Sequence, residues 1–413
     1  MTAQAASVTA EDFLDRDQAE ARPAKWGGVM AMTLCVFALI ASEFMPVSLL
    51  TPIASDLRVS EGLAGQGVAI SGAFAVLTSL SISSLAGSLN RKTLLLALSA
   101  LMAVSGAVVA LAPNYLMYLV GRALIGVVVG GFWSMSAATA MRLVPSRQVP
   151  LALAIFNGGN ALATVVAAPL GSYLGALIGW RGAFFGLLPV ALAAFAWLAI
   201  SLPSMPVQPR SANSASSVNS GNVFTLLKKR AVALGMAGCG AFFMGQFALF
   251  TYLRPFLETV TQVGVSTLSL ILLVIGVAGF IGTTLIGVLL KRGLHQTLIA
   301  IPILMAVIAL TLIPLGASVA AVATLLGLWG LMATAAPVGW WSWIAQAMPT
   351  NAEAGGGLMV AVIQLAIALG STLGGVLFDS RGYQSTFVAS AALLLLAALL
   401  TFLTARSPTP GAA

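Results

Sequence analysis

A few charged side chains interrupt the long apolar stretches of this sequence. Glu43 lies in SEFMPVSLLTPIASDL, close to Pro46 and Pro52, and Arg122 lies in YLVGRALIGVVVGG. A carboxyl group can bind and release a proton, whereas a guanidinium group stays protonated and pairs with anions. We therefore expect Glu43 to exchange a proton and Arg122 to hold the ionised carboxylate. The alternative is a structural ion pair with no part in proton exchange.

A second polar group lies in GQFALFTYLRPF, where Gln246, Phe250 and Arg254 follow one another at intervals of four residues. Side chains at this interval share one face of a helix. An amide can hydrogen-bond a sugar hydroxyl or the edge of a heterocycle, and an aromatic ring can stack on it. We expect these three residues to contact a small-molecule substrate. Arg254 has the alternative of pairing with Glu258 or reaching the membrane surface.

Three further side chains are candidates for substrate contact. Trp133 follows Arg122 by eleven residues, which places both on one helical face, about 20° apart. Asn157 and Gln364 are uncharged polar residues within apolar stretches. Polar groups at membrane depth need hydrogen-bond partners, which are either neighbouring helices or a substrate.

The composition predicts a membrane protein with many spans. Only 7% of the 413 residues are charged, 59% are hydrophobic and the mean hydropathy is +1.02, whereas soluble domains carry about 25% charged residues. Apolar runs near the length that crosses a bilayer predict twelve spans. We place them at 27–52, 63–87, 93–112, 116–141, 150–175, 182–202, 231–256, 266–290, 297–316, 319–345, 355–378 and 384–404.

The spans divide six and six around a linker rich in Pro, Ser and Asn. An offset near 203 aligns Pro52 with Pro255 and Gly179 with Gly382, which predicts two similar helical bundles around a central path. The expected organisation is a cytoplasmic tail at 1–26, a first bundle at 27–202, a cytoplasmic linker at 203–230, a second bundle at 231–404 and a cytoplasmic tail at 405–413.

The basic residues indicate the orientation of the chain. Most of the 19 lysines and arginines fall before the first span, in every second connection or after the last span. The positive-inside rule therefore predicts that both termini lie in the cytoplasm, and it explains the net charge without a nucleic-acid partner. These residues are Arg16, Arg22, Lys25, Arg91, Lys92, Arg142, Arg147, Arg210, Lys228, Lys229, Arg230, Lys291, Arg292 and Arg406.

Several functional classes are disfavoured by the residues available. His295 is the only histidine, and Cys35 and Cys239 are isolated within spans. We therefore expect no metal, no cofactor and no enzymatic activity. The chain also lacks the Gly-rich lysine loop of a nucleotide-driven pump. A channel or a sensor remains open as an alternative to a carrier.

Several segments, including GGFWSMSAATAMRLVP, APLGSYLGALIGWR and GQFALFTYLRPF, resemble the major facilitator superfamily. Within it they are similar to the drug:proton antiporter and sugar-efflux group, especially its purine ribonucleoside efflux pumps. This resemblance implies an all-α fold of twelve transmembrane helices in two six-helix bundles. It also implies a monomeric carrier in the lipid bilayer of the bacterial inner membrane that exports inosine, guanosine and similar nucleosides in exchange for protons. Sugar or multidrug efflux is the alternative.

The resemblance also distributes roles among the residues. It assigns proton coupling to Glu43 and Arg122, both of which line the central cavity in that fold. Substrate contact is then expected from the aromatic, amide and basic residues Trp133, Asn157, Gln246, Phe250, Arg254 and Gln364. One loop departs from the family pattern, because GSLNRKTLL has Asn90 and no acidic residue.

Overall fold

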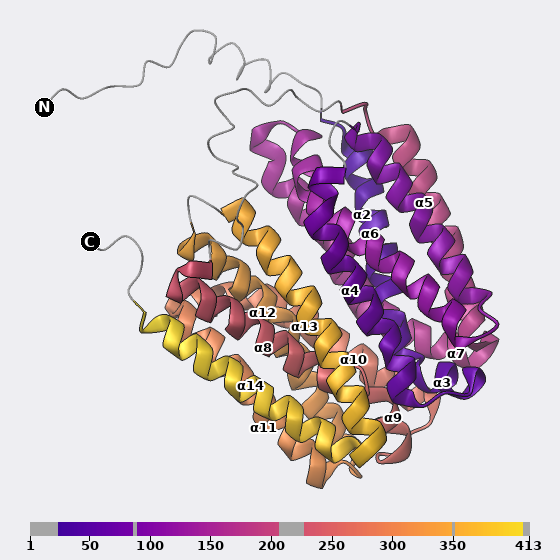
Figure 1. Cartoon of the computed structure of the whole chain (residues 1–413), viewed down its shortest axis with the longest axis vertical. Helices are drawn as coiled ribbons and strands as arrows, with labels where there is room; N and C mark the ends of the chain where they lie inside the picture. The colour runs from indigo at the N-terminus through magenta and orange to yellow at the C-terminus, as the bar shows by residue number, and fades with distance from the viewer. Residues whose placement is uncertain (1–23, 86–88, 206–226, 349–351, 408–413) are drawn as a thin grey trace, which may run out of the picture.

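The computed structural model describes residues 24–85, 89–205, 227–348 and 352–407, and Figure 1 shows these helices as two bundles. Residues 16, 22 and 210, part of the expected linker and most of both tails lie outside the described residues. The first bundle, called the N half here, consists of α2 (Trp26–Ser48), α3 (Leu50–Leu57), α4 (Glu61–Leu85), α5 (Arg91–Ala110), α6 (Tyr115–Arg142) and α7 (Val149–Ser201), with a 3₁₀ turn at Ser146–Gln148.

The second bundle, called the C half, consists of α8 (Arg230–Phe250), α9 (Leu253–Thr259), α10 (Val265–Arg292), α11 (Leu294–Leu315), α12 (Val319–Ala347), α13 (Ala352–Arg381) and α14 (Tyr383–Ala405). Among the described residues, eleven helices are long and apolar enough to cross a membrane. One of them, α7, has 53 residues and leaves helical geometry at Gly179, so it contains two spans. The predicted twelve spans and the fold class are therefore confirmed.

The backbone repeats itself between the two halves at the predicted offset. Gly179 and Gly382 have φ angles of 76° and 78°, and they are the glycines in the left-handed φ region among the described residues. Glycine suits this left-handed region because it has no Cβ to clash. Arg58 and Gln262 both have φ of 55°, and they follow the short helices α3 and α9 in the two halves.

Two spans that were predicted to be continuous are broken. The expected span 27–52 divides at Leu49, where α2 ends and α3 begins, and the expected span 231–256 divides between α8 and α9. Pro52 and Pro255 lie three residues into the helices that follow the breaks. Proline lacks the N–H group that would bond the carbonyl one turn earlier, so both helices lose a hydrogen bond at the break.

Small residues bring the helices of each half close together. A Cβ atom on Gly126 of α6 would lie 2.2 Å from the carbonyl oxygen of Ser71 on α4, and one on Gly130 would lie 2.2 Å from that of Ala75. Gly330 of α12 makes the same kind of contact with Ile275 of α10. Glycine is thus required at these positions by backbone contact between helices.

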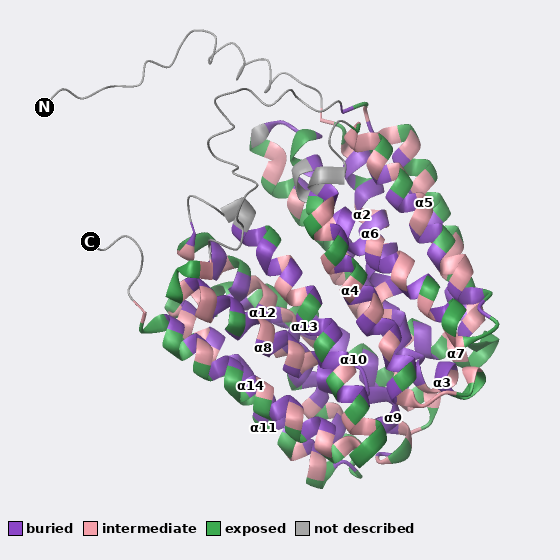
Figure 2. Ribbon diagram, viewed as in Figure 1, coloured by how far each residue is buried: buried purple, intermediate pink, exposed green. Residues whose placement is uncertain are grey.

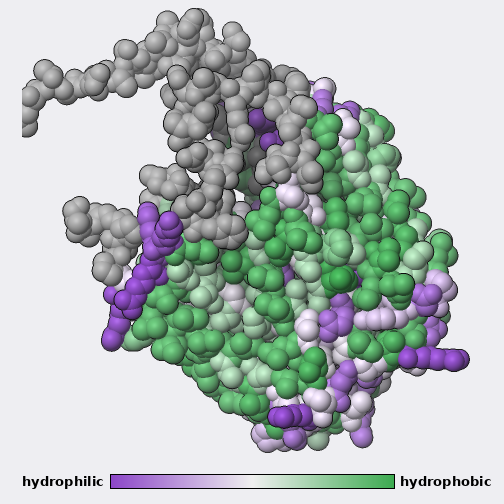
Figure 3. Space-filling view, viewed as in Figure 1, coloured by the Kyte–Doolittle hydropathy of each residue, from purple (hydrophilic) through white to green (hydrophobic). Residues whose placement is uncertain are grey.

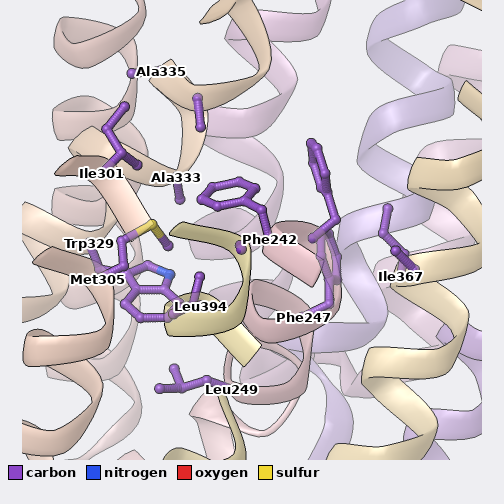
Figure 4. Packing of buried hydrophobic residues seen from close by; sticks show 14 of the residues in the cluster. Phe242, Phe247, Leu249, Ile301, Met305, Trp329, Ala333, Ala335, Ile367 and Leu394 are labelled. Carbon is purple, nitrogen blue, oxygen red and sulfur yellow. The ribbon is translucent and has the colours of Figure 1, made fainter. Parts of the chain in front are cut away.

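Apolar side chains fill the interior of both halves and cover the outside. Figure 2 shows buried and exposed residues alternating along the helices, and Figure 3 shows hydrophobic side chains over most of the visible face. In the C half, Met305, Trp329 and Leu394 from α11, α12 and α14 are buried in one cluster, and Figure 4 shows them lying against one another. An apolar exterior around a packed interior is what a lipid environment favours.

The two halves meet where α4 packs against α13 and where α7 packs against α10. Within the described residues, hydrogen bonds between the halves gather toward the end that contains α3 and α9, here called the α3/α9 end. In Figure 1 the two bundles converge toward this end and diverge away from it.

Asn90 has a structural role at the opposite end. Its side-chain oxygen accepts hydrogen bonds from the backbone N–H groups of Lys92, at 2.9 Å, and Met205, at 3.1 Å. Its amide donates to Ser204 at 2.7 Å. Asn90 therefore caps the start of α5 and holds the segment that follows α7.

Candidate functional site

Arg122 is buried between α6, α4 and α2 with only 1% of its surface exposed. Its Nη1 donates to the carbonyl oxygen of Ser42 at 2.8 Å, and its Nε donates to that of Gly67 at 3.0 Å. Its third nitrogen, Nη2, is buried without a hydrogen-bond partner. The guanidinium group thus joins three helices of the N half and keeps Nη2 available as a donor.

The prolines near Glu43 explain why these backbone acceptors exist. In a regular helix the carbonyl of Ser42 would accept from residue 46, and that of Ser48 from residue 52. Both positions are proline, which has no N–H group to donate. Arginine side chains bind the two carbonyls instead: Arg122 donates to Ser42, and Arg254 of the C half donates to Ser48. Each proline therefore creates a buried acceptor that an arginine occupies.

Glu43 lies next to this arginine site and is half-buried. Its carboxyl group is within electrostatic range of Arg122, and the side-chain amide of Gln364 on α13 lies close enough to interact with it. The ion pairs of the described residues are Arg181 with Asp56 and Arg254 with Glu258. The expected interaction of Glu43 with Arg122 is therefore electrostatic in this conformation, without direct ion-pair contact, and Gln364 adds a partner from the other half.

Aromatic rings join α2 to α8 beside Glu43. The ring of Phe44 lies 6.3 Å from that of Phe247 and 6.2 Å from that of Phe250, measured between centroids. The neighbouring Gln246 is half-buried, and its Oε1 atom is buried without a partner. Polar and aromatic groups from both halves thus meet at one level of the molecule, as a site for a flat, polar ligand requires.

Arg254 makes the pairing with Glu258 that the sequence offered as its alternative, and its contact with a substrate stays a prediction. Arg254 is 5% exposed, and its Nε donates to Glu258 at 2.7 Å. Gln246, Phe250 and Arg254 do not form one continuous helical stripe, because α8 ends at Phe250 and α9 begins at Leu253. Pro255 cannot bond the carbonyl of Thr251, so the helix breaks between the amide and the arginine. The contacts of Arg254 tie the two halves together.

Two other predicted residues lie apart from Glu43. Trp133 is half-buried and packs edge-on against Phe156, with ring centroids 6.0 Å apart. Asn157 is exposed, and its amide donates to the carbonyl of Leu153 in its own helix at 2.9 Å. No described contact joins either side chain to Glu43, Arg122 or Gln364.

Sequence reasoning missed a group that joins the halves at the α3/α9 end. Asp379 of α13 accepts from the Ser60 hydroxyl at 2.5 Å and from the Gly62 backbone N–H at 3.0 Å. A carboxylate is favourable at the N-terminus of a helix, here α4. Thr372 and Gln66 form a second bond between α13 and α4, at 3.1 Å. No local pattern marks these residues, because their partners lie in the other half.

Known proteins resemble the chain along most of its length. The chain is 68% identical over 388 residues to the transcription regulatory protein OpdE of Pseudomonas aeruginosa, covering 93% of this chain and 95% of that one. It is 41% identical over 391 residues to the purine ribonucleoside efflux pump NepI of Salmonella enteritidis, covering 95% and 96%.

A solved structure shares the fold. A bacterial homologue of the human lysosomal transporter Spinster, in an inward-facing and unoccupied conformation, has a TM-score of 0.77 over 94% of this chain and 98% of its own, at 15% identity. The family model of the Major Facilitator Superfamily matches residues 32–371. With twelve spans in two repeated bundles and charged groups at their junction, the chain belongs to the major facilitator superfamily.

Proposed function

We propose that this chain exports purine ribonucleosides from the cytoplasm in exchange for protons. The observation that carries the proposal is the position of Glu43, near Arg122 of its own half and Gln364 of the other. A carboxyl group at membrane depth between two moving bundles can take up a proton on one side and release it on the other. Uptake and release of this proton would then couple substrate export to the proton gradient.

The choice of substrate is supported by the relative that is named a purine ribonucleoside efflux pump. The chemistry beside Glu43 fits such a ligand: Phe44, Phe247 and Phe250 offer aromatic faces, and Gln246 offers a free acceptor oxygen. A ribose hydroxyl or a purine N–H group would donate to that oxygen, and the base would stack on a ring. Trp133, Asn157 and Arg254 stay secondary candidates for substrate contact.

Export as the direction of transport is supported by the relative that is named an efflux pump, and the proposed orientation indicates which side the described conformation opens to. Arg91, Lys92, Lys291 and Arg292 lie at the helix ends opposite the α3/α9 end. Under the positive-inside rule this opposite end faces the cytoplasm. The hydrogen bonds at the α3/α9 end would then close the outer side, and the conformation described would accept a substrate from the cytoplasm.

A second candidate function comes from the relative that is named a transcription regulatory protein. A chain with twelve spans can affect transcription indirectly, by lowering the internal concentration of a small molecule that a regulator binds. This role needs the same transport step. It predicts that a variant without transport also loses the transcriptional effect, whereas a sensor would keep that effect without transport.

The test is nucleoside transport in everted vesicles with an imposed pH gradient, together with direct binding of inosine, ribose and a cationic drug to the purified protein. We expect inosine accumulation that depends on the gradient, competition by guanosine and no competition by ribose. Tight drug binding without detectable inosine binding would instead identify a multidrug exporter, and transport of ribose or another sugar would identify a sugar-efflux carrier.

The Glu43→Gln variant tests the role of the carboxyl group. The amide resembles the protonated acid and cannot release a proton, so we expect gradient-driven efflux to be lost while exchange of labelled for unlabelled inosine continues. Asp56→Asn is the matched control, because Asp56 pairs with Arg181 on the same half at the α3/α9 end. If inosine efflux by Glu43→Gln depends on the pH gradient as strongly as efflux by the unmodified protein, Glu43 has no role in proton coupling.

A further inference from the structure

Two buried polar atoms near Glu43 have no partner among the described residues. They are Nη2 of Arg122 in the N half and Oε1 of Gln364 in the C half. Arg122 is 1% exposed and Gln364 is 7% exposed, so bulk water does not supply a hydrogen-bond partner to either atom. A buried polar atom without a partner is unfavourable. Glu43 interacts with both side chains, and it can therefore supply the partner that each atom lacks.

The two free atoms differ in the form of Glu43 that they can bind. An ionised carboxylate only accepts hydrogen bonds, whereas a protonated one also donates through its O–H group. Oε1 of Gln364 is an acceptor, so only protonated Glu43 can satisfy it. Nη2 of Arg122 is a charged donor and bonds most strongly to the ionised form. One atom thus favours the protonated acid and the other favours the carboxylate.

Protonation of Glu43 adds a second hydrogen bond to the pair with Gln364. A carboxylic acid and a primary amide can form two bonds side by side, with the acid O–H donating to Oε1 and the amide N–H donating to the acid carbonyl. Ionised Glu43 can form only the second of these bonds. Because α2 and α13 belong to different halves, the added bond joins the halves.

We propose that Gln364 is a proton-dependent tie between the two halves: protonated Glu43 forms paired hydrogen bonds with the Gln364 amide, and ionised Glu43 moves away to Nη2 of Arg122. The inference rests on the proposed function, in which Glu43 carries the proton. The proton stays on the Glu43 oxygen while the tie exists and leaves to water when Glu43 ionises. Protonation thereby stabilises the conformation described here, in which the α3/α9 end is closed, and ionisation releases it.

Other charged groups on the helices around Glu43 are bound to partners or lie near helix ends. Arg254 of α9 is bound to Glu258 and to the Ser48 carbonyl. Asp379 of α13 bonds to Ser60 and Gly62. Arg181 of α7 pairs with Asp56. Among the described residues, the remaining charged ones of these helices lie near helix ends: Glu61 in the first turn of α4, Glu353 and Arg381 in the first and last turns of α13, and Arg230 at the start of α8. Glu43 is thus the carboxyl group at this level of the molecule whose protonation state we expect to change with pH.

The experiment follows the conformation of the substrate-free protein as a function of pH. Spin labels on Met141→Cys and Trp341→Cys would report the distance between the halves at the end opposite α3 and α9, since both residues are exposed near the ends of α6 and α12. Cys35 and Cys239 are buried and should not react. One linked proton changes a conformational ratio by up to about tenfold per pH unit. We expect the population with a closed α3/α9 end to increase as pH falls.

Three variants separate the tie from other effects. Gln364→Met keeps length and removes both hydrogen-bonding groups, so the ratio should change less than about twofold per pH unit instead of approaching the tenfold limit of one linked proton. Gln364→Asn keeps the amide on a shorter side chain, and it provides a second measurement of the pH slope if Gln364→Met does not fold. Thr372→Val removes the bond to Gln66 between the same two halves without a titratable partner. It should shift the ratio equally at all pH values and keep the slope.

The outcomes for Gln364 and Glu43 are distinguishable. If Gln364→Met and Gln364→Asn both keep the full pH slope while Glu43→Gln abolishes it, the tie is wrong and the proton role of Glu43 stands. If Glu43→Gln keeps the full slope, the proposed proton role itself is wrong. Loss of slope in both Gln364→Met and Glu43→Gln, with the slope of Thr372→Val retained, supports the tie.

Discussion

At the scale of single residues, Arg122 shows how a buried charge can be held without a direct ion pair. Its guanidinium group donates to two backbone carbonyls on two helices. Hydrogen bonds from charged groups are roughly twice as strong as neutral ones. The fixed geometry of these bonds positions Nη2 for a third partner, which explains why an arginine is suited to this place.

We expect Arg122→Ala to lose most transport, because the Ser42 carbonyl would be left without a donor, at a cost of about 1–3 kcal/mol. Arg122→Lys should be intermediate, since lysine keeps the charge but cannot span both carbonyls. Arg147→Ala is the matched control, because Arg147 is exposed. Nucleoside transport in vesicles measures the series, and equal rates in all four proteins would show that Arg122 has no role.

At the scale of helices, glycine and proline decide where α2, α4 and α6 lie. Pro46 and Pro52 leave two carbonyls of α2 available to arginines, and Gly126 lets α6 touch the backbone of α4. Arg122 extends from α6 between these helices. A change in helix packing should therefore alter the site without touching a charged residue.

Gly126→Ala tests this dependence. Its Cβ would lie 2.2 Å from the Ser71 carbonyl oxygen, and forcing the helices apart should cost about 1–3 kcal/mol of stability. Gly106→Ala is the control, because no atom lies within 4 Å of the added Cβ. It should stabilise the helix by up to about 1 kcal/mol. Thermal unfolding in detergent measures both, and equal midpoints would contradict the packing argument.

At the scale of the whole molecule, the halves are held together at the α3/α9 end by groups from distant parts of the chain. Asp379 binds Ser60 and Gly62, Arg254 binds the Ser48 carbonyl, and Thr372 binds Gln66. Each of these bonds must break when this end opens. Their strength therefore sets how much of the protein has a closed α3/α9 end.

We expect Asp379→Ala to increase the fraction of molecules in which this end is open, because it removes two bonds between the halves. A Gln66→Cys reporter in purified protein should then react faster with a maleimide. Asp56→Ala in the same background is the control, since Asp56 pairs with Arg181 and Trp180 within the N half. An equal increase in both variants would mean that local loosening, and not opening of the halves, exposes the cysteine.

The sequence alone was sufficient for the features that arise from each residue's own chemistry. Span length predicted the twelve spans, and the missing N–H of proline indicated strain in α2, although the full break at Leu49 was not predicted. The alignment of Gly179 with Gly382 was part of the predicted repeat, and the structure adds that both have a positive φ. Glu43 and Arg122 were identified because charges are costly inside a membrane, whatever their partners are.

Only the tertiary structure decided which partner each buried polar group meets. Every residue carries a backbone carbonyl, so nothing in residue type indicates that Arg122 binds those of Ser42 and Gly67. Asp379 reaches Ser60 across 319 positions, and Gln364 reaches Glu43 from the other half. Trp133 and Asn157 had suitable residue types but lie apart from Glu43. A hydrogen bond depends on distance and direction between two atoms, and for residues in different halves these are set by how the bundles pack.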